Sequence, residues 1–306
     1  MTKVSKNDDE DVIRRDNDEQ TLKQVQSVVL NIANCFSSFC EEHNLRYYLG
    51  FGSLLGAVRH GGFVPWDDDM DFLMPREDYE IFLTLAENGL ADWCDVRCFR
   101  HEGYNRCVTR VSDNRTALRL DSYLQGNELP IWIDVFALDG IPEGWFSRKA
   151  HGMRLLWRKA LWAFSAFDEV VNQNRPGRPL YQRVVIEACK RLHFGRHLDS
   201  FERLKAYDSL LQVYRYDEFE NVFCGTATYK LEKCVWPRKA YDSVREYPFE
   251  DAGFPGPVDF DSVLSITYGD YMTLPPENMR TIHHMDILKL PDHCKMSYAD
   301  NVEGSA

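Results

Sequence analysis

Residues 50–72 read GFGSLLGAVRHGGFVPWDDDMDF, and the acidic end of this stretch decides which fold the chain can adopt. A strand is predicted around residues 70–74. Because side chains alternate between the faces of a strand, Asp69 and Asp71 project on the same side while Met70 enters the core. Two carboxylates this close repel each other and are costly to desolvate. The pair therefore predicts a divalent cation between them.

A third carboxylate, Asp134, stands alone in the apolar segment 131–136, IWIDVF. A metal held beside Asp69 and Asp71 would give this acid a partner. Carboxylate oxygens suit Mg²⁺ or Mn²⁺, which keep some of their waters and share ligands with substrate phosphates. We therefore expect Asp69, Asp71 and Asp134 to be both the metal ligands and the catalytic residues of an Mg²⁺ (or Mn²⁺) site.

The residues before the acidic pair predict a phosphate-binding helix start. Gly52 and Ser53 open a predicted helix over 54–59, where free N–H groups, the helix dipole and the serine hydroxyl favour an anion. Arg59 can bind a phosphate oxygen if its helix points it inward. Gly52, Ser53 and Arg59 are thus the predicted donor-binding residues.

Each of these features also has an ordinary structural explanation. An Asp-x-Asp pair is common in solvated loops, a Gly-Ser pair often caps a helix, and an aspartate in an apolar strand can cap a turn. Their ordered combination is rarer and is typical of the nucleotidyltransferase superfamily. Asp67 and Asp68 fit loop structure or a supporting position better than direct metal ligation.

The rest of the pattern predicts an α+β protein with a mixed sheet core, flanking helices and a more helical second half. Apolar residues from Leu22 to Phe39 recur at intervals of three and four, as on one face of an amphipathic helix ending near 43–44. A turn is expected at Asp113–Asn114, and largely irregular structure after Trp236. Strands are expected at 46–49, 70–74, 93–100, 104–111, 116–120 and 131–136. Helices are expected at 54–59, 76–88, 145–166, 180–193, 199–214 and 259–267.

Composition divides the chain into four segments. The first is acidic and poor in apolar residues, which predicts a disordered leader. The one seam within the remainder is marked by Gly140, Pro142 and Gly144. We expect the leader, a nucleotidyltransferase-type catalytic core, a helical lobe with a C-terminal segment, and a tail at residues 1–18, 19–144, 145–295 and 296–306.

The overall composition limits the kinds of partner, the location and the cysteine chemistry expected for the protein. The 306 residues carry a formal net charge of −12, which argues against a general nucleic-acid binder. No apolar run approaches the ~20 residues that span a bilayer, and no signal-peptide segment is present, so a cytoplasmic protein is expected. Among nine cysteines, Cys94, Cys98 and Cys107 are close enough to suggest a structural metal, although buried or idle thiols are more common.

Residues 52–71 resemble the signature block of the LicD family, which includes bacterial phosphocholine transferases and, more distantly, fukutin and fukutin-related protein. The resemblance continues at 133–139, IDVFALD, at 268–276, YGDYMTLPP, and at His283–His284. It covers most of the chain, from about residue 20 to residue 290, and constrains the helices of 145–215 only loosely.

This resemblance implies a nucleotidyltransferase fold of the polymerase-β type. It also implies transfer of a phospho-alcohol from a CDP-alcohol donor to a hydroxyl of a cell-surface glycan or its precursor, as in lipopolysaccharide or teichoic acid, with release of CMP. CDP-choline is the favoured donor, CDP-ribitol serves other members, and the acceptor is a glycan or a lipid-linked glycan.

The mechanism expected from these features is mainly positioning and charge neutralisation. Asp69 and Asp71 hold the metal against the donor's pyrophosphate, and Asp134 completes the site and accepts the proton of the attacking hydroxyl. The histidines at 283–284 either contact phosphate or acceptor, or are ordinary surface residues. Residues 268–276 either close over the site as a lid or form a packed C-terminal turn.

Two other functions share these residues. A true nucleotidyltransferase would move NMP to a sugar phosphate or other small acceptor, and only the blocks 66–69 and 268–272 argue against it. A non-catalytic binding member of the fold would be expected to lack one of the three aspartates, and all three are present.

Residues 145–164 lie outside the signature and combine basic with aromatic side chains. A helix of this kind could make peripheral contact with the inner face of a membrane and reach a lipid-linked glycan. The favoured interpretation is an amphipathic helix with its Trp residues in the core and its basic residues solvated. The residues concerned are Arg148, Lys149, Arg154, Arg158 and Lys159 with Trp145, Trp157, Trp162 and Phe164.

Overall fold

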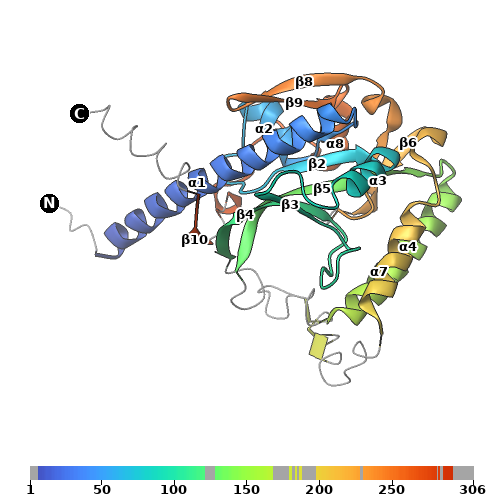
Figure 1. Ribbon diagram of the computed structural model, residues 1–306, viewed down its shortest axis with the longest axis horizontal. Coiled ribbons are helices and arrows are strands. Elements are labelled where there is room, and N and C mark those ends of the chain that lie inside the picture. The colour runs from blue at the N-terminus through green and yellow to red at the C-terminus, as the bar shows by residue number, and fades with distance from the viewer. Residues whose placement is uncertain are drawn as a thin grey trace.

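The structure is a computed structural model that describes residues 6–120, 128–167, 198–227, 230–280 and 285–291, together with the short pieces 179–180, 183–184, 186–187 and 282. Within these residues, helices cover a mixed sheet, and a pair of helices extends away from it (Figure 1). The α+β class predicted from the sequence is confirmed. Among the helices of these ranges, none has both the length and the apolar composition that crossing a bilayer requires.

One long strand, β5, organises the sheet, because it pairs with β2, β4 and β6. β2 and β5 run parallel, whereas the other pairings recorded in this sheet are antiparallel. Its strands are β1 (Tyr48–Leu49), β2 (Asp71–Pro75), β3 (Cys94–Arg97), β4 (Thr109–Leu120), β5 (Leu129–Ile141), β6 (Asn221–Phe223), β7 (Val235–Pro237) and β10 (Met285–Lys289).

Six helices are described, with several short 3-10 turns between them. The α-helices are α1 (Lys6–Glu42), α2 (Phe51–His60), α3 (Arg76–Leu85), α4 (Trp145–Ser165), α7 (Ser200–Leu211) and α8 (Phe260–Tyr268). The 3-10 turns are η2 (Tyr216–Glu218), η3 (Leu231–Lys233), η4 (Arg238–Tyr241) and η5 (Glu277–Met279). Most of the helix predicted at 180–193 lies outside the described residues.

Helix α1 lies across one face of the sheet (Figure 1) and buries the predicted apolar stripe. The stripe residues Leu22, Val25, Val29, Ile32 and Phe36 are almost completely buried, and Phe39 packs at the edge of this core. The structure differs from the predicted leader at 1–18, because the helix begins at Lys6. No Gly or Pro occurs before Gly50 to stop a helix in this region.

Strand β4 replaces two shorter strands and the turn that were predicted in this region. The expected turn at Asp113–Asn114 is wrong, because the strand continues to Leu120 and its register against β5 shifts between Asp113 and Leu118. The Arg115 N–H and guanidinium bond the Asp113 carboxylate, and the Thr116 hydroxyl donates to the Asp113 carbonyl. These local bonds satisfy the polar groups that an irregularity in a β-ladder leaves unpaired.

A second correction concerns the segment after Trp236, where β8 (Val244–Phe249) and β9 (Ala252–Pro257) form an antiparallel hairpin. Its prolines are tolerated because a two-stranded ribbon has open edges where no N–H is needed. Glu250, at the tip, takes a φ of 55° and accepts a hydrogen bond from the Phe63 N–H at 3.0 Å. The hairpin thus braces the loop that follows α2.

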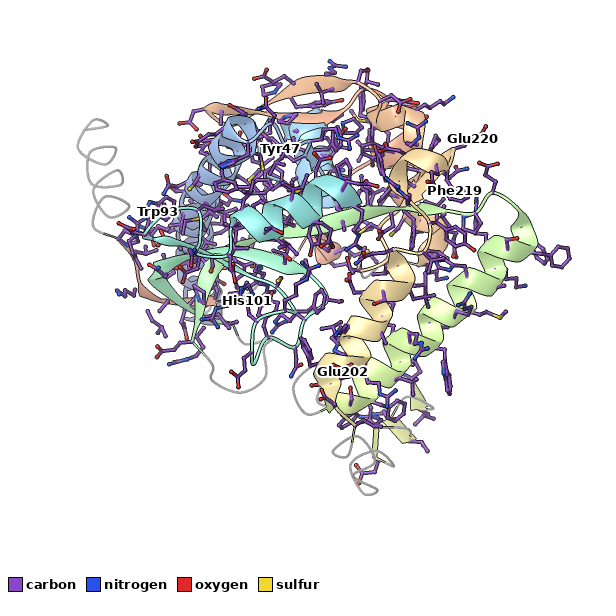
Figure 2. The ribbon with its side chains drawn as sticks, turned by 45° about the vertical axis from the view of Figure 1, so that its right-hand side comes forward. Tyr47, Trp93, His101, Glu202, Phe219 and Glu220 are labelled. Carbon is purple, nitrogen blue, oxygen red and sulfur yellow. The ribbon has the colours of Figure 1, made fainter. Side chains whose placement is uncertain are left out.

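Helices α4 and α7 lie side by side in both ribbon views, with Glu202 on α7 (Figures 1 and 2). They share a small core of their own with residues from β5, β6 and β7. Among the described residues, only one side of α4 is covered, and Trp162 is buried there. Trp145 and Trp157, which were expected in the core, are exposed, because none of the elements that the structure describes covers this face of α4.

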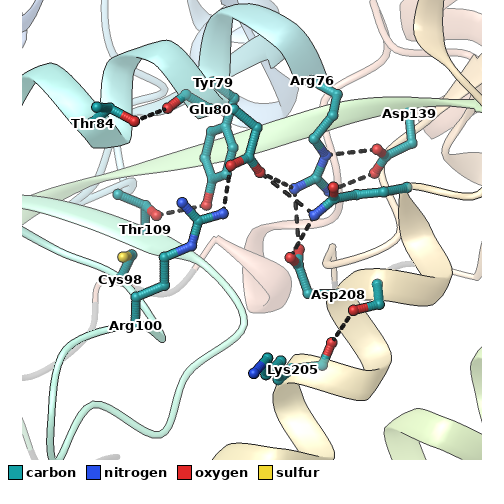
Figure 3. A network of polar contacts seen from close by, with 12 residues as sticks. Arg76, Tyr79, Glu80, Thr84, Cys98, Arg100, Thr109, Asp139, Lys205 and Asp208 are labelled. Carbon is teal, nitrogen blue, oxygen red and sulfur yellow. Dashed lines mark hydrogen bonds and ion pairs between the residues drawn. The ribbon is translucent and has the colours of Figure 1, made fainter.

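The end of β5 is fixed to α3 and α7 by a buried ion-pair network (Figure 3). Arg76 donates two hydrogen bonds of 2.7 Å to the Asp139 carboxylate and one of 3.0 Å to Asp208. Glu80 joins the network by pairing with Arg76 and Arg100. Since Arg76 and Asp139 are both buried, removing one partner leaves the other as an uncompensated charge.

We therefore expect Arg76→Met to lower the free energy of unfolding by about 3–5 kcal/mol. The matched control is Arg215→Met, because the exposed Arg215 pairs loosely with Glu77 at 3.6 Å and with Glu218 at 3.8 Å and should contribute at most about 1 kcal/mol. Urea unfolding followed by circular dichroism measures both. Equal losses in the two variants would contradict the buried network's role.

His151 is a buried titratable group on the covered side of α4. Its ring lies 4.9 Å from Tyr214 and 6.0 Å from Phe223, between centroids. Neither ring nitrogen has a hydrogen-bond partner in the described part of the chain. Burial, with a smaller contribution from Arg154, lowers the pKa of His151 below its ordinary 6.5. The folded state therefore holds a neutral imidazole more readily than the unfolded state does.

As a consequence, stability should fall as pH drops below about 6.5, because the unfolded chain binds the His151 proton first. His151→Phe keeps an aromatic ring but removes this linkage. The stability of the variant relative to the natural chain should therefore rise as the pH is lowered from about 8 to about 5.5. Urea titrations at both pH values test this. A difference in stability that stays constant with pH would show that His151 is not responsible.

Candidate active site

Strand pairing brings the predicted acidic residues together. The parallel register of β2 and β5 sets Asp71 opposite Asp134, and the antiparallel register of β5 and β4 sets Arg110 opposite Asp134. The Asp134 N–H donates to the Met70 carbonyl at 2.9 Å, which extends the pairing toward Asp69. Three neighbouring strands therefore present charged side chains at one level of the sheet.

The three carboxylates form a compact cluster. Ligand atoms of Asp69, Asp71 and Asp134 all lie within 4.8 Å of one another. Over the residues that the structure describes, this is the only group of three or more potential metal ligands that meets such a limit. The cysteines at 94, 98 and 107 therefore do not form the metal group considered from their spacing.

Burial and mutual repulsion make the carboxyls of this cluster weak acids. The pKa of Asp69 lies well above its ordinary value because of burial first and of Asp71 next. Burial and the charge of Asp134 likewise raise the pKa of Asp71, against the Gly52 N–H that hydrogen-bonds its carboxylate. Burial also raises the pKa of Asp134, and Arg110 opposes that rise. The site is thus arranged to attract positive charge.

The cluster lies in the wall of a cavity of about 550 Å³. Polar lining residues besides the cluster are Arg59, Asp67, Asp270 and Thr273. Five aromatic side chains supply much of the remaining wall: Phe51, Trp66, Phe136, Tyr268 and Tyr271. Acidic residues and aromatic rings therefore share one open space.

Gly52 and Ser53 support the cluster directly. Helix α2 begins at Phe51, earlier than predicted, so both residues lie in its first turn. The Ser53 hydroxyl accepts a hydrogen bond of 2.8 Å from the Asp71 N–H, and Ser53 is not among the cavity-lining residues. Gly52 does line the cavity, and a Cβ there would lie only 2.6 Å from Asp67 Oδ2. Both residues hold the start of β2 against α2.

Phe51 adopts a φ of 39°, which is unusual for a bulky residue. The strain is sustained by packing, since its ring contacts Phe136 at 5.4 Å and Trp236 at 5.7 Å between centroids. This conformation lets the chain turn sharply from β1 into α2, so that the Gly52 N–H points at Asp71. Backbone strain of this kind is most often found at functional sites.

Arg59 reaches the cavity from the far end of α2. Its Nη1 donates to the Tyr271 carbonyl at 2.8 Å, and Arg280 donates from Nε to the Pro275 carbonyl at the same distance. Burial, and to a smaller extent Arg280, lower the pKa of Arg59. The guanidinium of Arg280 lies 5.8 Å from the Trp66 ring centroid. Two cations thus stand near the aromatic wall.

The C-terminal family block forms part of this wall. Residues 268–280, here called the strap, contribute Tyr268, Asp270, Tyr271, Thr273 and Pro275 to the cavity lining. Of the alternatives left open for residues 268–276, the structure shows that this block forms part of the cavity wall. His283 and His284, whose role was left open, lie outside the described residues.

Arg110 is a site residue that the sequence did not reveal. Its Nε donates to Asp134 Oδ1 at 3.1 Å, and its guanidinium lies 3.8 Å from the Trp132 ring centroid. The pairing depends on the register between β4 and β5, and β4 carries the irregularity that was missed. The one signal available in the sequence was that the basic residue Arg110 lies in one predicted strand, 104–111, and the acidic residue Asp134 in another, 131–136.

Comparisons with known proteins agree with this site. Residues 44–149 match the family model described as the LicD/FKTN/FKRP nucleotidyltransferase domain. The lipopolysaccharide cholinephosphotransferase LicD of Haemophilus influenzae is 27% identical over 267 residues, which cover 87% of this chain and 96% of that protein. The ribitol 5-phosphate transferase FKRP of Homo sapiens is 53% identical over 38 residues, 12% of this chain and 8% of FKRP.

An uncharacterized protein of Rickettsia prowazekii is 49% identical over 137 residues, 44% of this chain and 48% of that protein. The matched family domain holds Asp69, Asp71 and Asp134 together with Gly52 and Arg59. Residues 44–149 therefore carry a domain of the LicD family, and similarity to a LicD protein extends over most of the chain.

The raised pKa values predict how Asp71→Asn should behave. Because the folded pKa exceeds the unfolded one, the carboxyl costs stability once the pH rises above its ordinary value of 3.8. Asn removes that charge and keeps an oxygen for the Gly52 N–H. In metal-free buffer at neutral pH, the variant should therefore melt a few degrees higher than the natural chain, as measured by scanning calorimetry.

Added Mn²⁺ or Mg²⁺ should reverse the order, because the natural chain gains stability from the cation and Asp71→Asn gains little. Asp92→Asn, an exposed aspartate away from the cavity, is the matched control and should follow the natural chain in both buffers. Equal stabilisation of Asp71→Asn and the natural chain by the cation would remove Asp71 from the metal ligands.

Proposed function

We propose that this chain transfers a phospho-alcohol, with phosphocholine favoured, from a CDP-alcohol donor to a hydroxyl of a cell-surface glycan or its precursor, releasing CMP. The observation that carries the proposal is the cluster of Asp69, Asp71 and Asp134 within 4.8 Å in the wall of an aromatic cavity. A nucleotidyltransferase-type fold is part of the proposal. The description of the matched family model and the parallel pairing of β2 with β5 support it.

The activities for which the relatives are named support this reaction class. One relative is a cholinephosphotransferase named for lipopolysaccharide, and another transfers ribitol 5-phosphate. We favour choline because the cholinephosphotransferase matches along nearly its whole length, and because aromatic rings bind quaternary ammonium groups through cation–π attraction. Phe51, Trp66, Phe136, Tyr268 and Tyr271 are the rings available in the cavity.

The acidic residues fit a divalent cation. Burial raises the pKa of all three carboxyls, and repulsion raises those of Asp69 and Asp71 further. Positive charge among them would relieve this cost, and hard oxygen ligands suit Mg²⁺ or Mn²⁺. Asp69, Asp71 and Asp134 would hold it. When bound, the cation supplies neutralisation of the negative charge on the donor's pyrophosphate.

The chain's own groups have separate tasks in this proposal. Arg110 favours the ionised form of Asp134, so that Asp134 accepts the proton of the attacking hydroxyl. Arg59, which lines the cavity, and Arg280, which lies beside Trp66, attract the donor's phosphates, and Trp66 offers a face for stacking the cytosine ring. Ser53 and the Gly52 N–H keep Asp71 in position.

The test is CMP release from a panel of CDP-alcohols (choline, ethanolamine, ribitol and glycerol) with Mg²⁺ or Mn²⁺ and a pool of simple glycosides. We expect CMP from CDP-choline. Asp69→Ala should lower the rate by about a hundredfold to a thousandfold, since loss of an electrostatic catalytic group commonly costs this much. Asp92→Ala is the matched control and should keep the natural rate.

Other outcomes would each reject part of the proposal. CMP from CDP-ribitol alone would keep the reaction class and reject choline. Consumption of CTP or another NTP with a sugar phosphate, and no CMP from any CDP-alcohol, would indicate a nucleotidyltransferase instead. Tight binding of CDP-choline by calorimetry without turnover on any acceptor, and with Asp69→Ala binding equally well, would indicate a non-catalytic binding protein.

A further inference from the structure

Helix α4 carries an apolar face that points away from the protein. Its buried residues His151, Leu155 and Trp162 are spaced by four and seven positions and so share one side of the helix. The opposite side carries large apolar side chains that each expose at least 60% of their surface. They are Trp145, Phe146, Met153, Leu156 and Trp157.

The spacing makes these exposed residues one continuous stripe. Phe146, Met153 and Trp157 are seven and four positions apart, and Phe164 extends the series by another seven. Trp145 and Leu156 lie along its edge. Single exposed apolar residues are ordinary, but a stripe of this length on one helix marks an interaction surface.

The charge of α4 is opposite to that of the rest of the chain. Between Trp145 and Ser165 the helix has five basic residues and no acidic one, whereas the whole chain has a net charge of −12. At 3.6 residues per turn, Arg154 and Arg158 flank the stripe on one side, and the exposed Lys149 lies 4.8 Å from the Trp145 ring centroid. Arg148 and Lys159 lie nearer the covered side, where they donate to the Pro142 and Ala227 carbonyls. The exposed face is therefore apolar along its centre and has basic groups beside it.

Two shallow hollows lie beside the stripe and continue the same character. One, of about 730 Å³, lies between α4 and α7 and includes Met153, Trp157 and Arg158. The other, of about 860 Å³, lies against β7 and η3 and includes Leu156, with Lys230. Glu232 is the one acidic side chain recorded in the lining of either hollow.

We propose that this face of α4 binds the surface of an anionic lipid bilayer. An amphipathic helix with Trp and Leu on one face and Lys and Arg beside them lies in the plane of the interface, with its apolar side chains among the headgroups and its basic groups on lipid phosphates. Charge complementarity selects this occupant. A second copy docked through the same face would set basic groups against basic groups, and a neutral partner would leave the basic groups without a role.

This inference does not depend on the proposed reaction, but the two features are linked by the chain. Strand β5 carries Asp134 and enters α4 through residues 142–144. A bilayer under α4 would therefore hold the sheet that carries the acidic cluster in a fixed orientation relative to the membrane.

The test is co-sedimentation of the full chain with vesicles of phosphatidylcholine alone and of phosphatidylcholine mixed with phosphatidylglycerol. We expect binding to the anionic vesicles, weakened by salt, with a blue shift of Trp fluorescence. The double variant Arg154→Glu/Arg158→Glu should weaken this binding by roughly tenfold or more. Leu156→Ser should weaken it as well and should also reduce the fluorescence shift.

Matched controls change exposed residues elsewhere. Arg97→Glu/Lys239→Glu alters the net charge by the same amount, and Ile81→Ser removes an exposed apolar residue from α3. Both should bind as the natural chain does, and thermal melting confirms that all variants are folded. Equal binding to neutral and anionic vesicles, or equal losses in the controls, would overturn the proposal. So would a stable dimer in sedimentation equilibrium that Leu156→Ser dissociates.

Discussion

Repulsion among three carboxylates is the constraint on which this structure depends. Asp69, Asp71 and Asp134 are held within 4.8 Å in partly buried surroundings, where each disfavours ionisation of the others. Electrostatic repulsion would drive the three carboxylates apart, so the backbone around them must be held in place. The parallel ladder of β2 and β5, the hydrogen bond from the Asp71 N–H to Ser53, and the ion pair of Arg110 with Asp134 provide this restraint.

Strand β5 carries two aspartates with different tasks in this arrangement. Asp134 and Asp139 are five residues apart, so they project from opposite faces of the strand. The first faces the cavity, and the second takes the bidentate ion pair with Arg76. The block 133–139 thus combines an acid of the candidate site with the buried ion pair that keeps its strand in place. The anchor can be strong because both of its charges are paired, whereas the cluster is left short of positive charge.

The sequence was sufficient for the parts of this site that are local. Strand alternation predicted that Asp69 and Asp71 share a face, and the apolar repeat from Leu22 to Phe36 predicted the buried side of α1. Features that depend on register were missed. Arg110 meets Asp134 only because of how β4 pairs with β5, and the hairpin β8–β9 is stable through cross-strand pairing although its own residues are rich in Pro and Gly. The exposed tryptophans of α4 were missed because periodicity shows that a helix has two faces and does not show which of them is covered.

The strap is held to α2 by a hydrogen bond to its backbone. Arg59 donates to the Tyr271 carbonyl, a backbone group that nearly every residue at that position would offer equally well. The closing segment can therefore change its side chains while its path over the cavity stays the same.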